Sequence, residues 1–220
     1  MIVALIIILL LLLPIFYNLL VPFKQPDLNN YFLPGQTFTS KAEGITQTII
    51  RQEGDKVYGE LTFEPQAAGP PEHMHYSFDE SGTVIAGTLS AKIDGEVIRL
   101  NAGERLLLKR GVYHKIFNET NEPVIFRSEQ KEDYLPVAFA YSLAQLYPLM
   151  EHHGKPTLKM IAKVAVLDDL FDSAPAGPPP VVFKVLIKIM KPYARLLGVT
   201  PYDEKSRPKL AGTPTRVENI

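Results

Sequence analysis

The stretch GPPEHMHYSFDE, residues 69–80, places His73 and His75 on either side of one methionine, with Glu80 five residues further on. Side chains two residues apart on a β-strand point to the same face, so the two imidazoles would enter one space. Imidazole and carboxylate groups together suit a divalent ion of iron, manganese, nickel, copper or zinc. Taken alone, the histidine pair is equally compatible with ordinary surface or core positions.

A fourth candidate ligand stands in GERLLLKRGVYHKIFN, residues 103–118, where His114 follows Gly111 by three positions and precedes Asn118 by four. If His114 faces the same interior, the ligand set becomes three histidines and one glutamate. The chain contains no cysteine, so His, Asp and Glu are the side chains available to a metal.

These residues resemble the two sequence motifs of the cupin superfamily. The matched positions are His73, His75, Glu80 and Gly87 for H-x-H-x4-E-x6-G, and Gly103, Gly111, His114 and Asn118 for G-x5-P-x-G-x2-H-x3-N. Two positions depart from the pattern: Gly69 stands closer to His73 than the leading glycine of the family, and Lys109 replaces its proline. The resemblance covers roughly residues 44–130.

The resemblance implies a mainly β fold, a cupin-type jelly-roll barrel, with a metal held by His73, His75, Glu80 and His114. Such a metal retains open positions for water, dioxygen or substrate. One function it implies is a metal-dependent, dioxygenase-like oxidoreductase acting on a small hydrophobic molecule. The alternative is a non-catalytic cupin that binds a small ligand or supports a membrane assembly. The cupin fold alone does not determine an activity. The resemblance also implies a possible homodimer, because members of the family often pair through edge strands.

The pattern around the ligands suggests pocket walls. The candidates are the aromatic residues nearest to them in sequence: Tyr76, Phe78, Tyr113 and Phe117. Each is equally compatible with the barrel core. By strand alternation Glu72 points away from the ligands, and Asn118 is expected to stabilise a turn. His152 and His153 make no ligand spacing and are interpreted as a helix end.

The first 23 residues carry no charged side chain, and Lys24 follows them. At about 1.5 Å per residue they are long enough to cross roughly 30 Å of hydrocarbon. A basic leader and a small-residue cleavage site, which a signal peptide would need, are not evident. The sequence therefore predicts an uncleaved, single-pass membrane helix over residues 1–23. Lys24 and Lys41 on its carboxyl side favour a cytoplasmic body.

Seven β-like runs separated by turn signals predict an all-β barrel over residues 42–133. They span residues 44–52, 56–64, 82–93, 96–100, 104–109, 113–118 and 124–130. Asp94-Gly95 between two of them is a two-residue hairpin signal. A linker over 24–41 precedes the barrel.

Beyond residue 133 the apolar spacing becomes helical, at 136–153, 156–171 and 181–198. These runs predict a helical extension over residues 134–198, and a flexible tail is predicted over 199–220.

Charge patterning adds two expectations about partners. A formal net charge of −1 gives no support to a nucleic-acid partner, which usually requires a basic excess. Lysines and an arginine recur at helical spacing at positions 155, 159 and 163, and again at 184, 188, 191 and 195. Cationic stripes beside an apolar face are typical of helices that lie on anionic membranes, and equally of helices packed on a barrel with their lysines in water.

Overall fold

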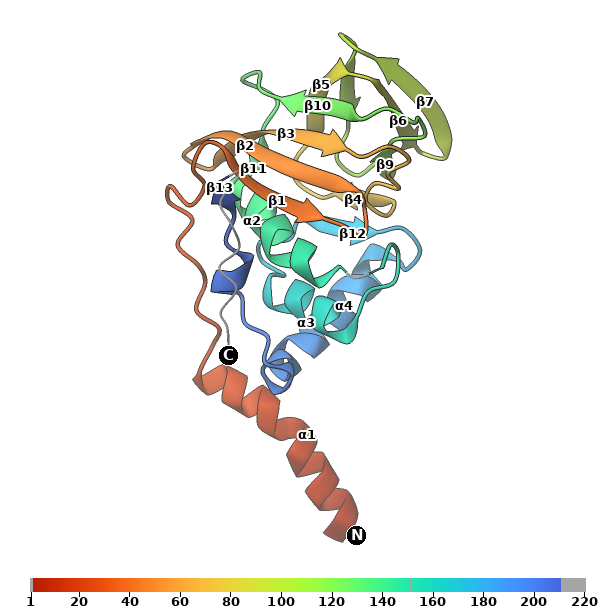
Figure 1. Ribbon diagram of the computed structural model, residues 1–220. Coiled ribbons are helices and arrows are strands. Elements are labelled where there is room, and N and C mark those ends of the chain that lie inside the picture. Colours follow the sequence, from red (N-terminus) through yellow and green to blue (C-terminus); the bar gives the residue numbers. More distant parts are fainter. Residues whose placement is uncertain (1, 151, 211–220) are drawn as a thin grey trace, which may run out of the picture.

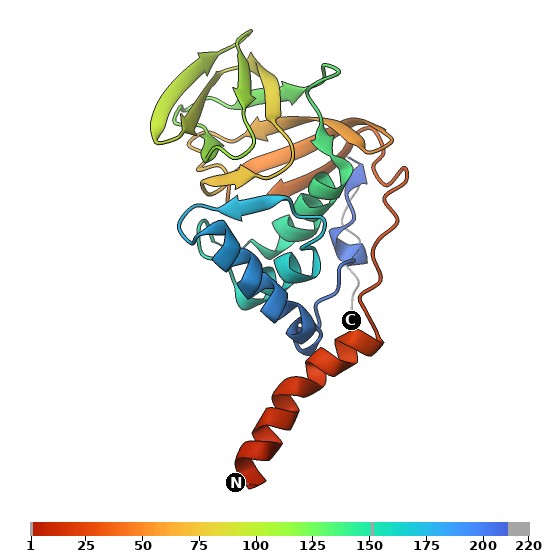
Figure 2. The same cartoon turned by 180° about the vertical axis from the view of Figure 1, so that it is seen from behind.

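A computed structural model describes residues 2–150 and 152–210 (Figure 1). Two antiparallel sheets form the upper part of the molecule in this view, and three helices lie beneath them. Helix α1 (Ile2–Leu20) projects away from this body, as Figure 2 shows from behind.

The larger sheet has eight strands. It contains β1 (Gln36–Ser40), β2 (Ile45–Glu53), β3 (Lys56–Phe63), β5 (Glu80–Ala86), β8 (Arg105–Leu108), β10 (Val124–Ser128), β11 (Leu135–Pro136) and β13 (Lys209–Leu210). Along its main path the order is β13-β1-β2-β3-β10-β5-β8, and β11 pairs with β3. In β2 the buried side chains alternate as Ile45, Gln47 and Ile49, because successive residues of a strand face opposite sides.

The smaller sheet has five strands, in the order β12-β4-β9-β6-β7. Its members are β4 (His73–His75), β6 (Thr88–Ile93), β7 (Glu96–Asn101), β9 (His114–Phe117) and β12 (Ser173–Pro175). Asp94 and Gly95 close the β6–β7 hairpin with φ values of 50° and 90°, as their sequence predicts. The two sheets enclose an apolar core that includes Phe63, Leu89 and Phe126. This is the predicted mainly β jelly roll, a double-stranded β-helix.

A second core joins the helices to the outer strands of the larger sheet. The helices are α2 (Val137–Leu146), η1 (Tyr147–Leu149), α3 (Leu158–Val166), α4 (Pro180–Met190), η2 (Lys191–Leu197) and η3 (Glu204–Ser206). Val137 and Tyr141 of α2 pack in one cluster with Phe38 and Ile49 of the sheet. Gly198 ends η2 in the left-handed conformation at φ 67°, which glycine adopts readily at the end of a helix.

Several predicted boundaries differ from the structure. The predicted linker, residues 24–41, contains β1. The described part of the predicted flexible tail is packed: Val199 and Ser206 are buried, and β13 pairs with β1. The Gln36 side chain donates to the Pro208 carbonyl at 3.1 Å, which ties this segment to the sheet. Residues 211–220 of the predicted tail lie outside the described residues.

Lys155 and Lys159 of the first predicted lysine stripe are exposed, but its third member is not solvated. Lys163 is buried and donates from Nζ to Gln145 Oε1 at 3.2 Å and to the Thr200 carbonyl at 2.9 Å. Burial lowers its pKa to about 8. Periodicity placed this lysine among polar positions, but the segment after η2 covers it and supplies its acceptors.

The predicted membrane helix is not supported. Helix α1, which corresponds to the predicted span, contains Pro14 and ends at Leu20. Within residues 2–150 and 152–210, no helix meets the combined length and apolarity needed to cross a bilayer.

Candidate metal centre and the adjoining cavity

Three separate strands bring the four predicted ligands together. His73 and His75 lie on β4, Glu80 begins β5, and His114 begins β9. His73 and His114 are direct partners in the β4–β9 pair, so their rings meet across the strands with centroids 4.7 Å apart. One ligand atom from each of the four residues lies within 4.8 Å of all the others. That spacing suits a single ion bound at the centre.

The second ring nitrogen of each histidine is held by a hydrogen bond outside the cluster. His73 Nδ1 lies 2.8 Å from the Pro71 carbonyl, and His114 Nδ1 lies 2.9 Å from the Val112 carbonyl. His75 Nδ1 lies 3.2 Å from the Asp172 carbonyl. Because a carbonyl oxygen only accepts, each Nδ1 carries the proton, and each Nε2 presents a lone pair. This is the arrangement that orients histidines toward a metal.

Glu80 completes the donor set. Its Oε2 atom lies 3.3 Å from His75 Nε2 and 3.5 Å from His114 Nε2. His114 Nε2 is buried and makes no hydrogen bond to any of residues 2–150 and 152–210. A buried nitrogen lone pair facing a carboxylate, with its own proton on the opposite side of the ring, is left without a partner unless a cation lies between them. The residues therefore fit a divalent transition metal.

Electrostatics keep the glutamate charged and His73 neutral. Burial lowers the pKa of His73 to about 3, reinforced by the nearby His75 and His114. Burial would raise the pKa of Glu80, but in the metal-free site a protonated His114 or His75 could donate to this carboxylate, and this outweighs burial and lowers its pKa. Burial likewise opposes protonation of His114, but Glu80 raises its pKa overall. A neutral imidazole and a carboxylate are the forms that bind metal.

The helical extension contributes to the site through β12. Ser173 pairs with His75 in the β12–β4 ladder, and its hydroxyl lies 2.9 Å from His75 Nδ1. Behind the ligand, Phe78 stacks on the His75 ring at 4.2 Å, and Phe139 of α2 meets the same ring edge-on at 4.8 Å. A segment almost 100 residues away in sequence therefore fixes the orientation of one ligand.

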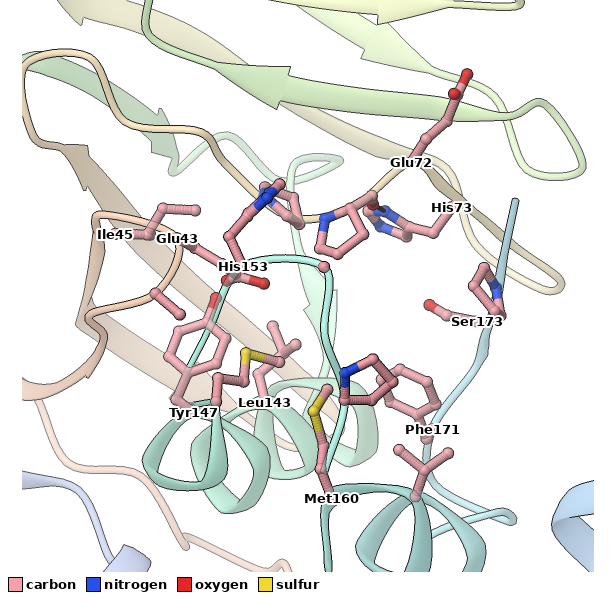
Figure 3. A pocket seen from close by; sticks show the side chains of 18 of the residues that line it. Glu43, Ile45, Glu72, His73, Leu143, Tyr147, His153, Met160, Phe171 and Ser173 are labelled. Atoms are coloured by element: carbon pink, nitrogen blue, oxygen red, sulfur yellow. Dashed lines mark hydrogen bonds between the residues drawn. The ribbon is translucent and has the colours of Figure 1, made fainter. Parts of the chain in front are cut away.

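A cavity of about 430 Å³ adjoins the four ligands. His73 and Glu80 form part of its wall. The rest of the wall is mainly apolar, and both sheets and the helices contribute to it. Its apolar residues are Ile45, Leu61, Ile116, Leu135, Phe139, Leu143, Met150, Met160, Ile161, Val164, Phe171, Phe183 and Ile187. Figure 3 shows His73 and Ser173 on one side of this cavity, Tyr147 and Glu43 on the other, and Leu143 and Met160 below. The volume is in the range of small-molecule sites.

Comparison with protein families decides what kind of domain carries this site. Residues 59–128 match the family model described as the cupin domain. The chain therefore contains a cupin domain. The matched segment includes all four candidate ligands, and the fold of the two sheets agrees with it. No curated protein matches the chain.

Solved structures resemble parts of the chain. A sugar phosphate isomerase of the cupin superfamily from Silicibacter pomeroyi is 21% identical, covers 43% of this chain and 63% of its own, and gives a TM-score of 0.36. KdgF from Halomonas sp. is 25% identical over 42% of this chain and 86% of its own, with a TM-score of 0.34. The cupin domain of a transcriptional regulator of the XRE family from Enterobacter cloacae is 21% identical. The match covers 38% of this chain and 92% of its own, with a TM-score of 0.34. The chain thus spans less than two thirds of the first of these proteins.

The four aromatic residues predicted as pocket walls lie elsewhere in the cupin domain. Phe78 is buried behind His75, and Tyr76 borders a smaller pocket of about 100 Å³. Among the described residues that line the large cavity, neither Tyr113 nor Phe117 occurs. Phe117 follows His114 by three positions on β9 and therefore faces the opposite side of the strand. The other three aromatic residues lie in the segments next to β4 and β9, where alternation does not apply.

Several neighbours of the ligands act as expected. Asn118 holds a turn: its Nδ2 donates to the Glu64 and Glu122 carbonyls at 2.9 and 2.8 Å. Glu72 forms an ion pair with Lys92 at 2.8 Å, and its side chain extends away from His73 in Figure 3. Gly69 has φ 69°, and a Cβ there would lie 1.8 Å from the Ile116 carbonyl oxygen. This glycine is required despite its irregular spacing to the motif.

The sequence analysis did not predict several polar residues of the cavity, among them Glu43, Tyr147 and His153. Glu43 stands in the short turn between β1 and β2, where a charged residue normally predicts exposure. Tyr147 follows α2 and matches the spacing of an ordinary core face. His153 was assigned to a helix end, but its Nε2 contacts the Gly69 carbonyl at 3.1 Å in a loop beside the cavity. No spacing in the sequence connects these residues to the motif histidines.

Proposed function

We propose that this protein is a metal-dependent, dioxygenase-like oxidoreductase that acts on a small and mainly apolar molecule. The observation that carries the proposal is that His73 and Glu80 belong both to the ligand cluster and to the wall of the cavity. A molecule in the cavity would therefore lie against the metal position. A bound transition metal would supply Lewis-acid and one-electron redox chemistry there.

The protein's own groups prepare the site for such a ligand. The backbone carbonyls of Pro71, Val112 and Asp172 hold the three imidazoles in one tautomer. The apolar wall excludes water and thereby strengthens electrostatic interactions at the ligand cluster. Both features support binding of an oxygen-bearing group of the ligand beside His73 and Glu80.

Metal analysis is the first test of the proposal. We expect the full-length protein, purified without chelators, to contain about one equivalent of a transition metal. The double variant His73→Ala/His75→Ala should retain less than about a tenth of it, because two of the four ligands are lost. His152→Ala, an exposed histidine outside the cluster, is the matched control and should keep the metal. Metal-free wild-type protein, together with unchanged stability of the double variant, would exclude the metal-dependent function.

The alternative is a non-catalytic cupin that binds a small ligand. Dioxygen uptake by the Fe(II)-loaded protein in the presence of phenolic and enolic compounds distinguishes the two. Uptake that depends on both the compound and His73 supports the oxidoreductase. Saturable binding of such compounds with no uptake and no conversion by any of the candidate metals supports the binding protein.

We also propose that helix α4 contacts a lipid surface. Val181, Val185, Leu186 and Ile189 of α4 are each more than half exposed. The exposed Lys184 and Lys188 stand beside them and would face anionic headgroups. The opposite face of the same helix carries Phe183 and Ile187 into the cavity wall. A lipophilic ligand would thus reach the cavity beside the helix that touches the lipid.

Some of the lysines near this face already interact with other side chains of the protein. Lys184 Nζ lies 3.8 Å from the centre of the Tyr76 ring, and Lys191 pairs with Asp169 at 3.1 Å. Apolar contact therefore supports this proposal more than charge does. Leu186→Asp/Ile189→Asp should reduce binding to phosphatidylcholine–phosphatidylglycerol vesicles about tenfold, whereas Val97→Asp, an exposed position of β7, should not. A change from homodimer to monomer in the double variant, with vesicle binding unaltered, would identify this face as a contact between two copies instead.

A further inference from the structure

Glu43 is a buried carboxyl group that the metal centre does not use. It stands between β1 and β2, is only 3% exposed, and lines the cavity. Ser40 is the side chain that opposes the effect of burial on the pKa of Glu43, and Glu43 Oε2 has no hydrogen-bond partner among the described residues. A buried carboxyl oxygen is removed from water, and without a new hydrogen bond it destabilises the fold unless a ligand donates to it.

A second unpartnered acceptor belongs to the same cavity wall. Gln47 lies on β2, two positions beyond Ile45, and both side chains point to the inner face of the sheet. Gln47 is 1% exposed, and its Oε1 atom makes no hydrogen bond within the part of the chain that the structure describes. Two buried acceptors without donors on one wall of an otherwise apolar cavity indicate that the ligand supplies the missing hydrogen.

Glu43 lies on the opposite side of the cavity from His73, a candidate metal ligand. Figure 3 shows Glu43 beside Tyr147 on one side and His73 beside Ser173 on the other, with the apolar Leu143 and Met160 below. Tyr147 is buried, and burial raises its pKa well above the usual value, so its hydroxyl stays neutral. The cavity thus has two polar ends of different chemistry and an apolar middle.

Resting on the proposed function, we propose that Glu43 and Gln47 recognise a hydroxyl group of the ligand. The ligand would be an apolar molecule with a metal-binding oxygen at one end and an alcohol at the other. Burial raises the pKa of Glu43 to about 7, so both of its protonation states occur near neutrality. A hydroxyl group suits both, because it donates to the carboxylate or to Gln47 and accepts from the protonated acid. An ammonium group only donates and would be desolvated in a mainly apolar cavity.

The test compares ligands that differ only at the far end. Hexanoate, octanoate and decanoate, their ω-hydroxy derivatives and their ω-amino derivatives are titrated calorimetrically into the full-length, Zn(II)-loaded protein. At the chain length that binds best, the ω-hydroxy acid should bind about tenfold more tightly than the unsubstituted acid. Glu43→Leu should abolish this preference and bind the unsubstituted acid at least as well as wild type. Glu64→Leu, an exposed glutamate at the end of β3, is the matched control and should keep the preference.

Each outcome separates the inference from the proposed function on which it rests. If none of the acids binds the wild-type protein, the apolar ligand of the proposed function is wrong. If the acids bind but hydroxylated and unsubstituted forms are equal, only the hydroxyl recognition is wrong. Tightest binding of the ω-amino acids also contradicts it. Gln47→Leu provides an independent check: it should reduce the preference, and retention of the full preference in both leucine variants would overturn the assignment.

Discussion

Glu80 and Glu43 are two glutamates that expose little surface in one cavity, and their surroundings shift their pKa values in opposite directions. Glu80 faces two imidazoles, which lower its pKa although burial opposes this. Glu43 has only the Ser40 side chain to compensate, and burial raises its pKa to about 7. Burial is common to both, so the partners decide the charge. One end of the cavity therefore holds a carboxylate suited to a cation, and the other an acid suited to a neutral polar group.

Removing Glu80 should have the largest effect. We expect Glu80→Ala to lower metal affinity at least about 100-fold, because the anionic ligand is lost and three neutral imidazoles remain. In the metal-free protein the pKa of His114 should fall, since Glu80 is what raises it. Chelator competition measures the affinity, and NMR titration of the imidazole measures the pKa. Unchanged affinity would remove Glu80 from the ligand set.

Replacing Glu43 should stabilise the protein at neutral pH. The pKa of Glu43 is raised from 4.5 to about 7 on folding, so the unfolded state releases its proton first as pH rises. Stability is therefore lost between about pH 4.5 and 7, and at 1.36 kcal/mol per pKa unit the loss reaches about 3 kcal/mol. Glu43→Gln, which carries no proton to lose, should be more stable than wild type above pH 7, and the difference should vanish below pH 4.5.

Urea unfolding of the metal-free protein at pH 4, 6 and 8 measures this difference. Glu80 predicts the opposite sign, because its lowered pKa stabilises the fold above pH 4.5 and is lost as pH falls below that value. If Glu43→Gln instead becomes less stable than wild type as pH rises, the Glu43 carboxylate must have a stabilising partner within the fold.

Removing the Ser173 hydroxyl, which contacts His75 Nδ1, should lower metal affinity moderately. Ser173→Ala leaves His75 Nδ1 with the Asp172 carbonyl alone, at 3.2 Å. We expect metal affinity to fall about tenfold, as for other groups that orient a ligand from behind. The same chelator competition measures it. Ser77→Ala, which removes a hydroxyl from Asp172 without touching His75, is the control and should change affinity less.

The smallest effect is expected at a third glutamate. Glu72 precedes His73 but pairs with Lys92 near the surface. Glu72→Gln should cost less than about 1 kcal/mol of stability, because partly exposed ion pairs contribute little. Metal affinity should remain within twofold of wild type. A larger loss of metal would show that Glu72 acts on His73 directly, and the contrast between buried and surface glutamates would need revision.

Local patterns accounted for much of the cupin domain. Alternation and turn residues located the main strands, and the Asp94-Gly95 hairpin formed as expected, because both depend on neighbours in the chain. The four candidate ligands were predicted from the resemblance to the cupin motifs together with strand alternation, and the structure brings them into one cluster that could hold a metal ion. β1 and β13 were missed: their short, polar-containing segments gain stability only by pairing with each other and with β2.

The patterns of the sequence predict an all-β barrel and a helical extension, and its resemblance to the cupin motifs adds the jelly roll and the candidate ligands His73, His75, Glu80 and His114. Only the tertiary structure placed the cavity beside those ligands, because its walls come from helices that follow the barrel by tens of residues. It also placed Glu43 and Gln47 without partners, Ser173 behind His75, and Lys163 inside. The physical reason is common to all of these. Burial and hydrogen bonding depend on which segments meet in space, and no pattern within one segment records its distant neighbours.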